Sequence, residues 1–83
     1  MQKFDAYIVS FLMPSYRGIE NDEQIIHTDD YEEAFKVFNQ CKRNKKYEAK
    51  RKWGNSLVLN GYNEEDCYLT RIKEIDLREL REG

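Results

Sequence analysis

One segment of the chain combines residue types suited to contact with an anionic partner. Residues 42–53 read KRNKKYEAKRKW, in which seven bases stand against a single acid, Glu48. Lysine and arginine neutralise phosphates, and an aromatic ring offers a surface on which an unpaired base stacks. Tyr47 and Trp53 supply two such rings. The bases that we assign to nucleic-acid binding are Lys45, Lys46, Lys50, Arg51 and Lys52.

Two other interpretations of this basic segment stay open. The bases also suit docking onto an acidic protein surface, and the simplest interpretation is a helix end followed by a solvated loop. The flanking sequence is acidic, which opposes contact with a phosphate backbone. Residues 1–41 hold three bases and eight acids, residues 42–52 seven bases and one acid, and residues 53–83 four bases and seven acids. The net charge of −2 therefore hides segments of −5, +6 and −3.

Catalytic chemistry has little support in the sequence. The single histidine, His27, has no serine or cysteine at a spacing that indicates a nucleophile and its base. Cys41 and Cys67 form no CxxC motif, and with one histidine they make no zinc-binding pattern. We expect both cysteines to be small buried apolar residues. We therefore predict a protein that is not an enzyme, with no catalytic residue, metal site or cofactor.

Two acidic clusters offer oxygen ligands for a cation, but each has a structural explanation. Residues 29–33 precede or open a predicted helix, where acids cap the backbone and suit the macrodipole. Residues 64–66 fall in a predicted turn and are expected to be solvated.

The chain carries more aromatic residues than so small a core need enclose. Six Tyr, four Phe and one Trp occur in 83 residues. Interfaces between proteins favour Tyr, Trp and Arg, which makes the surplus a sign of a binding surface, although core or sheet-face positions would also account for it. The residues that we assign to a partner interface are Tyr16, Tyr47, Lys50, Arg51, Lys52, Trp53 and Tyr62, with Tyr7 and Tyr68 as further aromatic candidates.

A hairpin is predicted at the start of the chain. Residues Phe4 to Met13 are apolar at almost every position and stop at Pro14, which favours a strand covered on both faces, or covered on one and open to a partner on the other; a helix is the alternative. A second strand, Glu23 to Thr28, follows a polar loop with turn-forming residues.

A helix follows the hairpin. Asp29 and Asp30 stand where a helix cap is expected, and the bases at positions 42, 43, 45 and 46 suit the last turn of the same helix. Half of the basic segment therefore has a structural explanation. The apolar stripe of the helix consists of Tyr31, Ala34, Phe35, Phe38 and Cys41.

Two more strands are predicted after the helix. The first runs from Trp53 to Leu59, and the chain then turns at Asn60-Gly61 or at the following NEED tract. The return strand is Cys67 to Ile75, with a helix over residues 69–80 as the alternative, and a short helix over residues 76–83 closes the chain.

The element order predicts a single α+β domain over residues 1–83. Its order is ββαββ, with an antiparallel sheet of about four strands packed on one helix and a short C-terminal helix. No apolar run approaches the ~18–20 residues of a membrane span, and no secretory signal is recognisable at the N-terminus. We therefore expect no membrane association and a cytoplasmic protein.

A short motif resembles a known DNA-binding family. Residues 51–57, RKWGNSL, are similar to the KWGNSL opening of the AbrB/MazE family of swapped-hairpin antitoxins and transition-state regulators. That resemblance would imply a dimeric β-barrel that binds DNA through basic loops. The family continues with an Arg-Ile-Pro turn, whereas this chain continues with Val58-Leu59-Asn60, and fifty residues precede the motif. We interpret the match as coincidental.

The whole chain is similar, in size and pattern, to small phage and prophage accessory proteins. A hairpin, a capped aromatic helix and a polar hairpin recur among them, and many of them bind and block a host protein such as a defence nuclease. The resemblance implies a phage-type inhibitor acting in the host cytoplasm, and it assigns no residue. Our first hypothesis is therefore a non-catalytic binding protein that blocks a host macromolecule, and the alternative is a nucleic-acid-binding regulator. An edge strand also offers pairing with a second copy as a homodimer.

Overall fold

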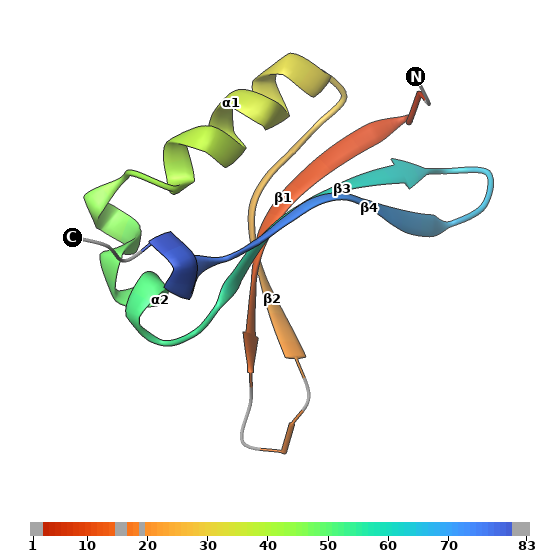
Figure 1. The fold of residues 1–83 in the computed structure, drawn as a ribbon. Helices are drawn as coiled ribbons and strands as arrows, with labels where there is room; N and C mark the ends of the chain where they lie inside the picture. The colour runs from red at the N-terminus through yellow and green to blue at the C-terminus, as the bar shows by residue number, and fades with distance from the viewer. Residues whose placement is uncertain (1–2, 15–16, 19, 81–83) are drawn as a thin grey trace.

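The computed structural model describes residues 3–14, 17–18 and 20–80, and its four strands form one antiparallel sheet (Figure 1). The strand order is β2-β1-β3-β4, so both ends of the sheet are open edges. This is the α+β, ββαββ domain that the sequence predicts. The strands are β1 Ala6–Pro14, β2 Glu20–Thr28, β3 Ser56–Asn63 and β4 Tyr68–Asp76.

The core lies between the two central strands and the first helix. Val9 and Phe11 of β1 pair with Leu59 and Leu57 of β3, and all four side chains are fully buried. On the opposite face the central pair of Ser10 and Val58 is buried as well, whereas Ala6, Ile8 and Leu12 are half-buried and Pro14 is exposed. The nearly continuous apolar run of the first strand therefore reflects its central position in the sheet.

The helix α1, Tyr31–Cys41, packs on this sheet with the predicted stripe. Ala34, Phe38 and Cys41 are buried, and the other members of the stripe are half-buried against the core. Asp30 is the N-cap, and its carboxylate accepts a hydrogen bond of 3.0 Å from the backbone N–H of Glu32. The helix is thus fixed at its start by a cap and along its length by burial.

The turn between β3 and β4 uses the second of the two predicted sites. The chain reverses over residues 64–67, whereas Asn60 and Gly61 remain inside β3. A Cβ on Gly61 would collide with the Phe4 ring, which lies over that glycine. Gly61 therefore serves close packing in the sheet, which explains why an Asn-Gly pair is not a turn here.

The segment after α1 differs most from the prediction. The helix ends at Cys41, and the expected placement of Lys42 to Lys46 in its last turn is wrong. A short 3₁₀ helix, η1 Lys45–Tyr47, and a second helix, α2 Glu48–Lys52, follow instead. Asn44 causes the interruption, because its side-chain oxygen accepts from the N–H of Lys46 at 2.9 Å and so starts a new helical turn.

The start of the third strand was also predicted wrongly. Trp53 ends α2 as its C-cap, Gly54 follows with a φ of 76°, and β3 begins only at Ser56. The positive φ is the reason, since it turns the chain between helix and strand. Near the C-terminus β4 is a strand, which excludes the alternative of a helix over residues 69–80. The short helix predicted after it is a 3₁₀ helix, η2 Leu77–Leu80.

No helix within the described residues is both long and apolar enough to cross a lipid bilayer.

Candidate anionic-partner interface

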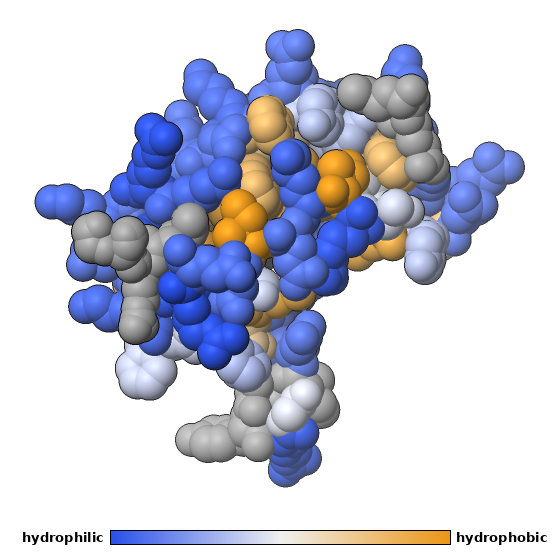
Figure 2. Space-filling model, in the orientation of Figure 1, coloured by the Kyte–Doolittle hydropathy of each residue, from blue (hydrophilic) through white to orange (hydrophobic). Residues whose placement is uncertain are grey.

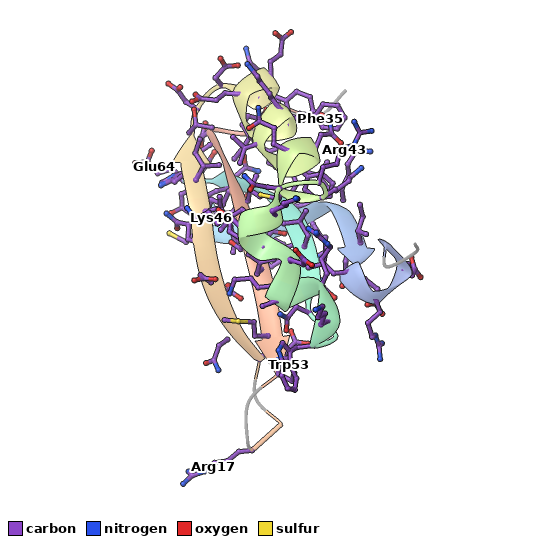
Figure 3. All side chains as sticks on the ribbon, turned by 90° about the vertical axis from the view of Figure 1, so that its left-hand side faces the viewer. Arg17, Phe35, Arg43, Lys46, Trp53 and Glu64 are labelled. Atoms are coloured by element: carbon purple, nitrogen blue, oxygen red, sulfur yellow. The ribbon has the colours of Figure 1, made fainter. Side chains whose placement is uncertain are left out.

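The bases after α1 gather on one side of the molecule. The chain forms a turn, η1 and α2 over this segment. Bases that would be far apart in an extended chain therefore lie around one short helical unit. Arg43, Lys46 and Trp53 are labelled on this side in Figure 3, and the left-hand edge of Figure 2, where it is not drawn in grey, is mostly hydrophilic. We call this surface the basic end; its residues are Lys42, Arg43, Lys45, Lys46, Arg51, Lys52 and Trp53.

Most of these cations have no carboxylate partner. Within the described residues the ion pairs are Lys50–Glu23, Arg71–Glu74 and Arg78–Asp76. None of them involves a base of the basic end, so no acid among the described residues pairs with these six cations at contact distance.

Some bases of the basic end do make contacts within the fold. Lys42 lies 5.4 Å from the centroid of the Phe38 ring, and Lys46 lies 5.5 Å from that of Tyr47. Arg51 donates a hydrogen bond of 3.2 Å to the carbonyl of Asn44. These contacts orient the side chains but leave their charges available, because neither an aromatic ring nor a carbonyl neutralises a cation.

Lys50 has a different role from its neighbours. Its side chain is half-buried, its ammonium pairs with Glu23 of β2, and it lies 3.7 Å from the sulfur of Met13. It also lies 5.4 Å from the centre of the Phe11 ring. Lys50 therefore attaches α2 to the sheet, so its positive charge is already paired and it contributes little to an anionic interface.

Trp53 is the most exposed large apolar residue that the structure describes, at 77%. It lines a shallow groove of about 380 Å³ together with Met13, Pro14, Ala49, Lys50 and Asn55. Asn55 is buried, and its side-chain amide donates a hydrogen bond of 2.9 Å to the carbonyl of Lys50. The base of the groove is thus fixed, while the indole beside it is open to solvent.

The other predicted interface aromatics lie elsewhere. Tyr47 packs on Phe11 with ring centroids 4.9 Å apart, and Tyr7 belongs to the core. Tyr62 is half-buried near the end of β3 that lies farthest from Trp53. Tyr68 is 66% exposed but follows the β3–β4 turn. The structure therefore brings together Arg51, Lys52 and Trp53 from the predicted set and separates them from Tyr62; Tyr16 lies outside the described residues.

The surplus of aromatics is smaller than the composition suggests. Most of the described aromatic side chains lie in or against the core cluster, which leaves few for a partner. Those in or against the core are Phe4, Tyr7, Phe11, Tyr31, Phe35, Phe38 and Tyr47.

The acidic clusters stand apart from the basic end. Residues 64–66 form the turn at the end of the β3–β4 hairpin, which projects away from α2 in Figure 1. Residues 29–33 lie at the N-terminal end of α1, opposite the end from which the basic segment continues. The clusters at residues 29–33 and 64–66 therefore do not surround the bases in space. Other acids of the flanks lie closer, because η2, which carries Glu79, packs against α2, and Glu23 pairs with Lys50.

The titratable groups with a shifted pKa are Cys41, Tyr62, Asp76 and Arg78. Burial raises the pKa of the Cys41 thiol, and the nearby Lys46 ammonium acts in the opposite direction. Hydrogen bonds from Arg78 lower the pKa of Asp76, and the neighbouring Cys67 is the main cause of a raised pKa at Tyr62. None of these groups is arranged as a nucleophile with a base.

The remaining candidates for chemistry also stay apart. His27 is exposed on β2, and among the described residues no group of three or more His, Cys, Asp or Glu is placed to hold a metal ion. Both cysteines are free. Cys67 is exposed, with a φ of 50°, so the expectation that both cysteines are buried is wrong for this one. Its place in a tight turn, rather than its apolar character, decides its exposure.

Sequence reasoning missed α2 and the groove beside it. The signal that could have found the helix is Asn44, a preferred N-cap residue, followed by the helix-forming residues Glu48 and Ala49.

Comparisons of the chain with protein-family models, with curated proteins and with solved structures found no match. The resemblance to phage accessory proteins therefore stays a prediction.

Proposed function

We propose that the protein is a non-catalytic binding protein that places its basic end on an anionic surface of a macromolecular partner and so blocks that surface. The observation that supports the proposal is the set of six cations without an ion pair within the described residues. They lie on a short helical unit whose own fold uses only Lys50 for an ion pair.

Electrostatics gives the reason why such a surface binds. Like charges held close together repel one another, and a partner that supplies anions relieves this repulsion on association. Complementary charge also steers the encounter and favours one orientation of the molecule. Because the acidic clusters of residues 29–33 and 64–66 lie at other ends of the fold, they would point away from a partner bound at the basic end.

A blocking role agrees with the size of the protein. The resemblance to phage accessory proteins suggests a host macromolecule, such as a defence nuclease, as the partner. A domain of 83 residues that occupies an anionic surface excludes other ligands from it without any chemistry of its own.

Retention on immobilised heparin, used as a generic polyanion, tests the proposal. We expect the wild-type protein to bind at about 50 mM salt and to elute as salt rises. The double variant Lys45→Glu/Lys46→Glu should elute much earlier. The matched control Lys3→Glu/Lys73→Glu changes the net charge equally and should elute close to the wild type. Equal loss in both variants, or no retention of the wild type, would contradict the proposal.

A further inference from the structure

We infer that the basic end is a site for single-stranded nucleic acid, in which an unpaired base stacks on the Trp53 indole and the neighbouring phosphates contact the cations. The inference rests on the proposed function, because it requires that the basic end bind a polyanion. It adds the class of partner and the contact that selects it.

The exposure of Trp53 is the first observation. The indole is 77% exposed and takes no part in the core cluster, so the fold gains little from it. Gly54, with its φ of 76°, turns the chain immediately after Trp53 and thereby leaves this residue at the corner between α2 and β3. Stacking by a flat aromatic base would bury an apolar surface that the protein alone leaves in water.

The surroundings of Trp53 are the second observation. Arg51 and Lys52 precede it in α2 and have no ion pair within the described residues. On the other side lies the groove of about 380 Å³, with Met13 and Pro14 as apolar walls. An exposed aromatic ring flanked by free cations is the combination that binds single strands without sequence preference, because every base has a face that stacks and every nucleotide has a phosphate.

One charged side chain, that of Lys50, also lines the groove and is held in place by an ion pair. The Lys50 ammonium lines it but is held by Glu23, so it is not free to follow a phosphate. The phosphates are therefore expected along the cations of the basic end. Arg51 and Lys52 would lie nearest the stacked base and Lys45 and Lys46 farther along the strand, with the base directed toward the groove.

A double helix and an acidic protein fit this arrangement less well. Bases in a duplex are already stacked on both faces and leave the indole without a partner. Helix α2 has five residues, which gives it little length to lie along a major groove. An acidic peptide would neutralise the cations but has no need of an open indole face.

Trp53 is the only tryptophan of the chain, so its fluorescence reports on this site alone. Oligothymidylate and oligouridylate of about 12 nucleotides are titrated against the full-length protein, beside an abasic oligomer of equal length, a duplex and polyglutamate. We expect the single strands to quench the fluorescence and to bind about tenfold more tightly than the abasic oligomer. Binding of either the deoxy or the ribo oligomer supports the inference and identifies the preferred sugar.

Two variants separate stacking from charge. Trp53→Ala should weaken binding of oligothymidylate about tenfold, measured with a labelled oligomer, while leaving its affinity for the abasic oligomer unchanged. Tyr68→Ala removes the other strongly exposed aromatic ring and should leave both affinities unchanged. The far-ultraviolet circular dichroism of both variants should match the wild type, which shows that they fold.

Several results would overturn the inference and leave the proposed function standing. These are equal affinity for the abasic oligomer and oligothymidylate, an unchanged affinity of Trp53→Ala for oligothymidylate, tighter binding of the duplex, or binding of polyglutamate alone. Failure to bind any of these polyanions would contradict the inference and the proposed function together.

Discussion

The two α-helices lie beside the same sheet but are held there by different means. Helix α1 has 11 residues and buries Ala34, Phe38 and Cys41. Helix α2 has five residues and buries none; Lys50 and the amide of Asn55 attach it instead. In α1 packing decides the residue types, whereas in α2 most side chains are free of the core. The comparison teaches that the residues proposed for binding lie where packing constrains the chain least.

The largest expected effect is the loss of stability when a buried side chain of α1 is removed. Phe38→Ala removes a fully buried ring and should lower the free energy of unfolding by about 3–5 kcal/mol. Trp53→Ala, at the end of α2, should change it by less than about 0.5 kcal/mol because the ring is exposed. Urea unfolding measures both. A cost at Trp53 that approaches the cost at Phe38 would break the comparison between the helices.

A smaller effect is expected at Asn55, the residue before β3, whose side chain holds the end of α2. Asn55→Ala leaves the carbonyl of Lys50 without its donor and should cost about 1–3 kcal/mol. It should also alter the fluorescence of Trp53, two residues away. Asn44→Ala, which removes the cap of η1, is the control and should cost about 1 kcal/mol. If Asn55→Ala changes neither stability nor fluorescence, the amide does not position the groove.

The ion pair of Lys50 should contribute less still. Lys50→Met keeps an apolar stem against Met13 but removes the pairing with Glu23, so the expected loss is below about 1 kcal/mol and should shrink at high salt. Lys52→Met, an exposed base of the same helix, should not change the stability measurably. Equal losses of stability in the two variants would show that the ion pair of Lys50 does not stabilise the fold.

The smallest effect concerns Cys41 at alkaline pH. Because burial raises the pKa of this thiol, the unfolded chain loses the proton more readily than the folded one. The contribution of Cys41 to the free energy of unfolding is therefore complete below the pKa that its thiol has in the unfolded chain. It is lost as the pH rises through the pKa of the thiol in the folded chain. Urea unfolding between about pH 7 and pH 10 should show a shallower decline for Cys41→Ala than for the wild type. Identical slopes in Cys41→Ala and the wild type would contradict the assignment.

The sequence predicts most of the fold because its long elements carry strong patterns. The apolar run before Pro14 favours a strand, with a helix as the alternative, and the stripe of α1 indicates a helix; each pattern extends over about ten residues, and both the strand and the helix are present. Asn60-Gly61 offered a second turn site, and only the packing of Phe4 on Gly61 shows why it is not used. That contact joins residues far apart in sequence, so no local pattern reports it.

The composition of the sequence predicts which residues belong to the candidate interface, but it does not predict how the chain folds around them. A helix of five residues has no room for an apolar stripe, so periodicity could not find α2, and Trp53 was assigned to a strand on its residue type. The partner of Lys50 is Glu23, and their pairing depends on how α2 sits on the sheet. Sequence alone therefore could not separate the base that holds the fold from the bases that remain free.

The salt dependence of binding tests the role of the basic end most directly. The affinity for oligothymidylate should fall as salt rises, and the slope of log K against log salt should be about −2 to −4 if three to six cations contact phosphates. Lys45→Glu/Lys46→Glu should reduce the magnitude of that slope by about 1.4, because each lost phosphate contact removes about 0.7. Lys3→Glu/Lys73→Glu should leave it unchanged. A slope near zero in the wild type, or the same slope in both variants, would contradict the assignment of binding to the basic end.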